Sequence, residues 1–188
     1  LYFTALGALV PYWGPYLKHL GFSPVEIGEL VAVFMATRIA APLLAGWLSD
    51  RYGRRMVLVR LTTLGSCVAF AGVLGGQSYA WLALIMALYA FFWHAVLPQF
   101  EVLTLAHLGE RTERYSEVRL WGSVGFIVAV VGLGELFERV SLDVFPWVLI
   151  GSALSLWLKE DGLSRSTIGW AGLIFGVYAI NFLWAPLI

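Results

Sequence analysis

The chain has 188 residues, of which 60% are hydrophobic and only 13% charged, and its mean hydropathy is +0.82. A soluble domain of this size is about half apolar and about a quarter charged, so too few charges are present to cover a water-facing surface. Twelve basic residues balance twelve acidic ones, and this balance gives no indication of a nucleic-acid partner. The composition predicts an all-α, polytopic transmembrane helical bundle whose main surroundings are the lipid bilayer.

Apolar runs of about 20 residues, the length that a membrane-spanning helix needs, alternate along the chain with short charged stretches. We expect spans at residues 1–17, 26–48, 56–76, 79–107, 117–136, 144–158 and 167–188. The second span has a clear helix start, with Ser23 at the N-cap, Pro24 at the first helical position and Glu26 closing a capping box. Pro11 and Pro15 give the first span a backbone that can break.

The positive charges predict how the chain is oriented in the membrane. They gather after the second and fourth spans, at Arg51, Arg54, Arg55, Arg60, Arg111, Arg114 and Arg119. The alternate loops hold only Lys18 and Arg139. Cytoplasmic loops carry the excess of lysine and arginine, so we expect the N-terminus in the cytoplasm.

The loop after the second span carries the motif that identifies a family. It reads GWLSDRYGRR over residues 46–55, and it resembles the signature loop G-x-x-x-D-R-x-G-R-[RK] between helices two and three of the major facilitator superfamily. Gly46 allows close helix approach, Gly53 suits a tight turn, and Asp50 can accept hydrogen bonds from helix-terminal amides or arginines. The resemblance implies that this loop, with Arg51, Arg54 and Arg55, stabilises one gating conformation. The alternative is a positively charged cytoplasmic turn without a gating role.

Two further stretches narrow the resemblance to one branch. Residues 16–28 and 41–50, YLKHLGFSPVEIG and APLLAGWLSD, are similar to the first two helices of the branch that contains phenylpropionate permeases and nucleoside–proton symporters. Residues 115–134 resemble that branch's fifth helix and lack the Gly-Pro motif of drug–proton antiporters. The resemblance implies a bacterial inner-membrane secondary transporter: a proton-coupled symporter of a small organic solute, working by alternating access.

A second copy of the first outer turn lies near the end of the chain. WLKEDGLSRSTIG at 157–169 repeats YLKHLGFSPVEIG at 16–28, and transporters are built from such repeats. We expect residues 1–155 to form the N-terminal six-helix half and residues 156–188 to correspond to the end of helix seven and helix eight. Matching turns should share a side of the membrane, so this spacing indicates a fragment or an internally deleted chain. The alternative function is therefore a truncated, non-transporting remnant, whose activity would need the missing second half or another chain.

Two charges inside predicted spans are the main candidates for transport chemistry. Arg38 lies near the middle of the second span and Glu101 in the inner half of the fourth. Charges in hydrocarbon are costly and are usually functional. We hypothesise that Arg38 binds an anionic group and that Glu101 couples protons or binds the solute. The alternative is a structural ion pair of Glu101 with Arg38 or with Arg119.

Several polar and aromatic residues form a second group of candidates. Tyr12 and Trp13 would stack on a ring-shaped solute or belong to an interfacial aromatic belt. His94 would relay protons or be a satisfied interior histidine, and Gln99 shares its helix. Asn181 is the one strongly polar side chain in the last span, where it could reach a cavity.

The fifth span carries small residues on one helix face. They are Gly122, Gly125, Ala129 and Gly132. Such a stripe permits close helix packing in lipid, and we expect it to pack on another helix or to slide during alternating access. The sequence has no metal-ligand spacing, nucleotide-binding glycine loop or nucleophile–base–acid set, so we expect no metal, no cofactor and no enzyme.

Overall fold

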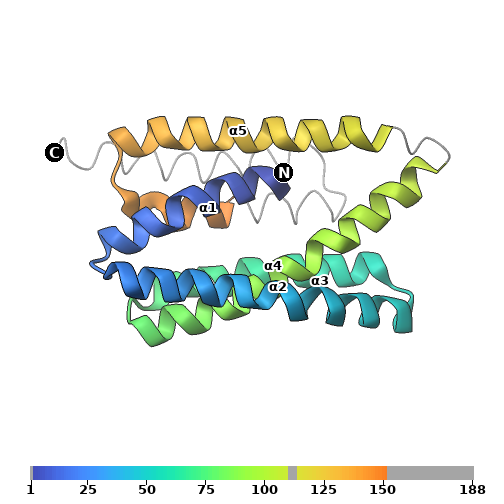
Figure 1. The fold of residues 1–188 in the computed structure, drawn as a ribbon, viewed down its shortest axis with the longest axis horizontal. Helices are drawn as coiled ribbons and strands as arrows, with labels where there is room; N and C mark the ends of the chain where they lie inside the picture. The colour runs from blue at the N-terminus through green and yellow to red at the C-terminus, as the bar shows by residue number, and fades with distance from the viewer. Residues whose placement is uncertain (1, 110–113, 152–188) are drawn as a thin grey trace.

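The computed structural model describes residues 2–109 and 114–151, and within these ranges every regular element is helical. The bundle, drawn in Figure 1, is all-α as predicted. Its elements are α1 (Tyr2–His19), α2 (Pro24–Tyr52), α3 (Arg55–Ala71), η1 (Gly72–Gly75), α4 (Tyr79–Leu108), α5 (Tyr115–Arg139) and η3 (Leu142–Val144), which opens a short apolar helical segment, Leu142–Gly151.

The long helices match the predicted spans in place and in character. Four of them are long and apolar enough to cross a membrane: α2, α3 with η1, α4 and α5. α1 coincides with the first predicted span, and Leu142–Gly151 begins where the sixth was expected. The rest of the sixth span, the seventh span, the repeated turn at 157–169 and the boundary after residue 155 lie outside the described residues.

The connection from α1 to α2 follows its sequence signals closely. Gly21 takes a left-handed φ of +93° in the turn, where a side chain would be strained. The Ser23 backbone N–H donates to Glu26 Oε2 at 2.8 Å, and the Glu26 N–H donates to Ser23 Oγ at 3.4 Å. The predicted capping box is therefore confirmed. The break that two prolines could produce in α1 is not present, because this helix is continuous from Tyr2 to His19 through both of them.

Consecutive helices run in opposite directions, so the connections divide between the two ends of the bundle. The α1–α2, α3–α4 and α5–η3 connections lie at one end in Figure 1, and the α2–α3 and α4–α5 connections lie at the other. Arg51, Arg54 and Arg114 therefore share one end, which we call the arginine end. Lys18 and Arg139 lie at the opposite end. This is the alternation that the charge pattern predicted.

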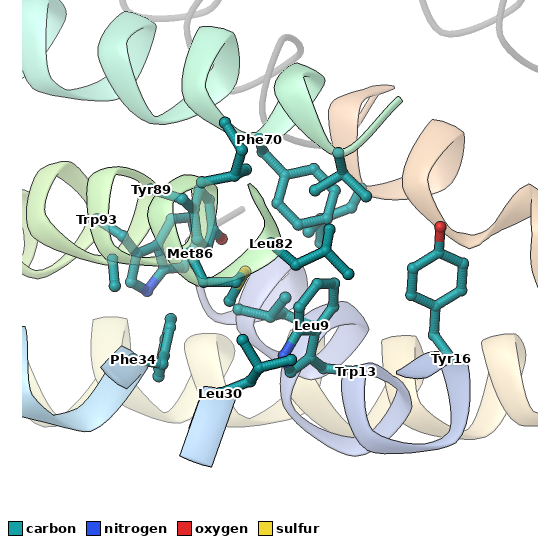
Figure 2. Packing of buried hydrophobic residues seen from close by; sticks show 14 of the residues in the cluster. Leu9, Trp13, Tyr16, Leu30, Phe34, Phe70, Leu82, Met86, Tyr89 and Trp93 are labelled. Atoms are coloured by element: carbon teal, nitrogen blue, oxygen red, sulfur yellow. The ribbon is translucent and has the colours of Figure 1, made fainter. Parts of the chain in front are cut away.

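Helix α4 is the centre of the packing. α2 and α3 pack along it, while α1 packs mainly along α5. Figure 2 shows the buried cluster in which Met86, Tyr89 and Trp93 of α4 meet Phe34 of α2 and Phe70 of α3. The Phe70 and Tyr89 rings are 5.0 Å apart with an interplanar angle of 62°, an edge-on arrangement that suits aromatic quadrupoles. Because lipid supplies no water-exclusion force between helices, such van der Waals packing holds these helices together.

The small-residue stripe of α5 faces α1. A Cβ added at Gly122 would lie 2.5 Å from Phe3, and one at Gly125 would lie 2.8 Å from Thr4 Oγ1. Gly7 of α1 lies against the stripe, since a Cβ added at Gly7 would lie 3.2 Å from the Ala129 Cβ. Among the described residues, no atom lies within 4 Å of a Cβ added at Gly132, so this fourth member of the stripe is outside the contact with α1. Three of the four stripe residues thus pack against α1.

Candidate functional site

The motif loop closes the arginine end between α2 and α3. Gly53 ends α2 with φ +63°, and its N–H donates to the Ser49 carbonyl at 2.9 Å. Asp50 Oδ1 accepts a hydrogen bond from Arg55 Nη2 at 2.9 Å. The Asp50 side chain is 71% exposed, and exposed ion pairs contribute little to stability. The pair therefore fixes where Asp50 lies and adds little to the free energy of unfolding.

The other glycine and arginines of the motif are less constrained. Arg51 and Arg54 are exposed, and α3 begins after Arg54 without a side-chain cap. A Cβ added at Gly46 would meet nothing within 4 Å. The close helix approach expected at Gly46 is thus not seen in the part of the chain that the structure describes.

Arg38 is an exposed cation in the middle of α2. Among the described residues, no carboxylate lies within ion-pair distance of its guanidinium. Its electrostatic field reaches Tyr2 on α1 and His94 on α4. Three helices therefore bring polar groups to the surroundings of this one charge.

His94 is held by α2 through a short hydrogen-bond chain. Its Nδ1 lies 3.0 Å from Thr37 Oγ1, which also donates to the Phe34 carbonyl at 2.9 Å. Because a hydroxyl has one proton, a Thr37 hydroxyl that donates to the Phe34 carbonyl accepts its second hydrogen bond from the His94 ring. The ring centroid lies 4.8 Å from that of Phe34. His94 is thus a half-buried histidine that is hydrogen-bonded to the facing helix.

Glu101 pairs with α5 and not with Arg38. Its Oε1 accepts a hydrogen bond from the Tyr115 hydroxyl at 3.3 Å and lies 3.6 Å from Arg119 Nη1. Arg119 Nη1 also donates to the Tyr115 hydroxyl at 3.4 Å. Of the sequence alternatives, the structure has the Glu101–Arg119 pair. The sequence reading missed Tyr115, although its position four residues before Arg119 places both on one helix face.

The aromatic candidates of α1 lie in helix contacts. The Tyr12 hydroxyl donates to the Val130 carbonyl of α5, and its ring lies 5.0 Å from Phe137. Trp13 is only 4% exposed and packs in the core beside Phe70, so it does not belong to an interfacial belt. Its Nε1, and Oε1 of the buried Gln99, have no hydrogen-bond partner among the described residues. Asn181 lies outside the described residues.

Tyr2 is a further residue near Arg38 that the sequence analysis did not predict. Its ring stacks on Trp93 with centroids 4.6 Å apart and an interplanar angle of 17°. The charges of both Arg38 and Glu101 act on its phenol. A tyrosine in an apolar run gives no pattern from which this placement could be predicted.

Comparison with known sequences identifies the family. The profile of the MFS_1 like family matches residues 1–171. The chain belongs to this family of the major facilitator superfamily. It is 30% identical over 183 residues to a protein of Escherichia coli K12 named probable 3-phenylpropionic acid transporter, an alignment that covers 90% of this chain and 48% of the relative. It is 29% identical over 181 residues to the maltose permease of Geobacillus stearothermophilus, covering 93% of this chain and 44% of the relative.

Both relatives are longer than this chain. The chain spans about half the length of the curated relatives it matches. No solved structure matches it. Family membership and the four apolar helices together make it an integral membrane protein with a major facilitator fold, and both relatives are named as carriers of small solutes.

Proposed function

We propose that this protein is a proton-coupled secondary transporter that carries a small organic anion by alternating access. We place it in a bacterial inner membrane, with the arginine end and the N-terminus on the cytoplasmic side. The observation that carries the proposal is Arg38, an exposed cation in the middle of a spanning helix without a carboxylate partner among the described residues. Membership of the family supports transport in general, and the positive charge of Arg38 supports an anionic solute.

An arginine in the hydrocarbon core of a membrane costs free energy. Insertion measurements give about 2.5–3.5 kcal/mol for arginine at the centre of a spanning helix. A bound carboxylate would offset this cost with charge-assisted, bidentate hydrogen bonds. The Tyr2 hydroxyl interacts electrostatically with the same charge, and it would donate a further hydrogen bond to the bound carboxylate. Phenylpropionic acid, in the name of one relative, has a carboxylate of this kind.

Glu101 is the proposed site of proton coupling. In the structure its carboxylate joins α4 to α5 through Tyr115 and Arg119. A proton bound to the carboxylate would remove its charge and weaken the attraction to Arg119. The α4–α5 contact, which is sparse elsewhere, would then loosen. Protonation and helix movement are coupled at one residue in this way.

Transport by reconstituted protein tests the proposal. The 188-residue chain in proteoliposomes should take up labelled 3-phenylpropionate faster when the outside is acidic. Arg38→Gln should lower the affinity about 10- to 100-fold, because it removes charged hydrogen bonds, while Arg38→Lys should keep part of it. Glu101→Gln should abolish the stimulation by the pH gradient. Arg139→Gln is the matched control, since Arg139 is exposed and pairs with Glu135 near the end of α5.

Two outcomes would overturn parts of the proposal. Uptake by Arg38→Gln equal to wild type would exclude an anion site at Arg38. Folded wild-type protein without uptake or counterflow would favour the alternative, a non-transporting remnant. The orientation is tested separately with single cysteines at positions 19 and 54 in a Cys67→Ser background, where a membrane-impermeant thiol reagent added outside should label position 19 alone.

A further inference from the structure

A groove runs along the last turns of α4 at the arginine end of the bundle. Its volume is about 430 Å³, which lies within the range of about 300–1,000 Å³ that small-molecule pockets have. Met56 of α3 and Val118 of α5 form its two sides. The floor is one stripe of α4 at positions i, i+3, i+4, i+7 and i+8, namely Phe100, Leu103, Thr104, His107 and Leu108.

The groove exists because of the course that α4 takes. α3 packs along α4, α5 packs mainly along α1, and the contact between α4 and α5 is sparse. In Figure 1 the last turns of α4 run away from α2 and α3 toward the start of α5. The first turns of α3 and α5 therefore lie on either side of α4, and one face of α4 is left between them.

The lining of the groove is apolar except near its mouth. The Thr104 hydroxyl donates to the Phe100 carbonyl at 2.7 Å, so its proton is used within α4. Met56 is 46% exposed and Val118 is 48% exposed, so both sides of the groove open to the surroundings of the bundle, which are lipid in a membrane protein. Of the lining side chains, His107 alone carries an N–H donor. The interior of the groove therefore suits a hydrocarbon chain.

Basic residues of three helices lie at the mouth of the groove. His107 is in the last turn of α4, and Arg114 directly precedes α5. Arg54 is exposed and directly precedes α3, two residues before Met56. Arg114 pairs with Glu117, whereas no carboxylate among the described residues lies within ion-pair distance of Arg54. The mouth thus carries positive charge, next to an apolar interior.

We propose that this groove binds one anionic phospholipid from the leaflet on the arginine side of the membrane. Basic pockets between spanning helices suit anionic lipid headgroups. One acyl chain lies along the α4 stripe, over about 12 Å between Leu108 and Phe100. The lipid phosphate accepts hydrogen bonds at the mouth from Arg54 and from the His107 ring. The bound chain would join the first turn of α3 to that of α5. The inference depends on membrane insertion and not on the anion site proposed for Arg38.

Native mass spectrometry of the 188-residue chain, released from nanodiscs, tests the inference. The nanodiscs contain equal parts of phosphatidylglycerol and phosphatidylcholine with the same acyl chains, so the two lipids differ in headgroup charge. Wild type should retain phosphatidylglycerol in preference. Val118→Trp should fill the groove and remove most of this retained lipid. Val128→Trp is the matched control, because it makes the same change on α5 at a position that is 65% exposed and does not line the groove.

Two further variants separate the groove from its charged mouth. Met56→Trp fills the groove from α3, at another exposed position, and should act as Val118→Trp does. Arg54→Gln should lower the retention of phosphatidylglycerol about fivefold, the effect of one arginine near an anionic leaflet, and should leave phosphatidylcholine unchanged. Thermal unfolding in detergent shows which variants are folded.

Three outcomes would overturn the proposal, and none of them depends on uptake or on Arg38. Equal retention of the two lipids by wild type, or no effect of Arg54→Gln, would exclude recognition of an anionic headgroup. Unchanged retention in both groove-filling variants would exclude the groove as the site. Equal loss in Val128→Trp would assign the retained lipid to the general lipid shell around the helices.

Discussion

Substituting alanine for Gly7 tests the close contact between α1 and α5. The added Cβ would lie 2.7 Å from the carbonyl oxygen of Phe126, a backbone atom of α5. A backbone atom cannot rotate away, so the two helices must separate. Overpacking of this kind costs about 1–3 kcal/mol, and the gain of about 0.5–1 kcal/mol from replacing glycine in a helix offsets only part of it. We therefore expect Gly7→Ala to lower the free energy of unfolding.

Gly132→Ala is the matched control on the facing helix. In the part of the chain that the structure describes, nothing lies within 4 Å of its added Cβ, so this variant keeps the stabilisation from replacing a helical glycine without a clash. Gly122→Ala should fall between the two, because its obstacle is the Phe3 ring, a side chain that can move. Denaturant or thermal unfolding in detergent, followed by tryptophan fluorescence, measures the order. Gly7→Ala at least as stable as Gly132→Ala would refute the packing argument.

Three further predictions concern the loops. Ser23→Ala should lower the free energy of unfolding by about 0.5–2 kcal/mol, the usual value of an N-cap, and the same unfolding assay checks it. Asp50→Asn should change that free energy by less than about 1 kcal/mol, because its pair with Arg55 is exposed, yet it should slow uptake in proteoliposomes if the motif gates. The hydrogen bond from Ser141 holds the pKa of Asp143 below its usual value, with a smaller contribution from His19. Since this pKa is depressed in the folded state, its stabilising effect is complete above the unfolded pKa of about 3.9 and is lost as the pH falls through the folded pKa. Unfolding followed between pH 6 and pH 3 (roughly the window around that pKa) should show this loss reduced in Ser141→Ala.

The sequence predicted those features that depend on neighbouring residues. Helix length follows from runs of apolar residues, and the start of α2 follows from Ser23, Pro24 and Glu26 within one turn. The sharing of one bundle end by Arg54 and Arg114 follows from alternating helices. Each of these is a local pattern or a count of crossings, and neither needs knowledge of which helices touch.

Features that depend on helix pairing were beyond the sequence. Arg38 and Arg119 were equal candidates to pair with Glu101, and only the course of α4 toward α5 selects Arg119. Gly7 contacts the α5 stripe because α1 packs along α5. The presence of glycine in an apolar helix does not show which helix it will contact. Tyr2 shows the same limit, since its stacking on Trp93 joins residues far apart in the chain.

The polar groups of the described helices differ in whether the described chain supplies them with a partner. Tyr12, His94 and Glu101 all have partners on neighbouring helices, so each of them contributes to holding the bundle. The Arg38 guanidinium has no carboxylate partner among the described residues, and the Trp13 N–H and Gln99 Oε1 have no hydrogen-bond partner there. Unsatisfied groups in a membrane are costly, and Arg38 is exposed in the middle of α2. The satisfied groups would then fix the arrangement of the helices, while the charge of Arg38 would select the anionic group of the proposed solute.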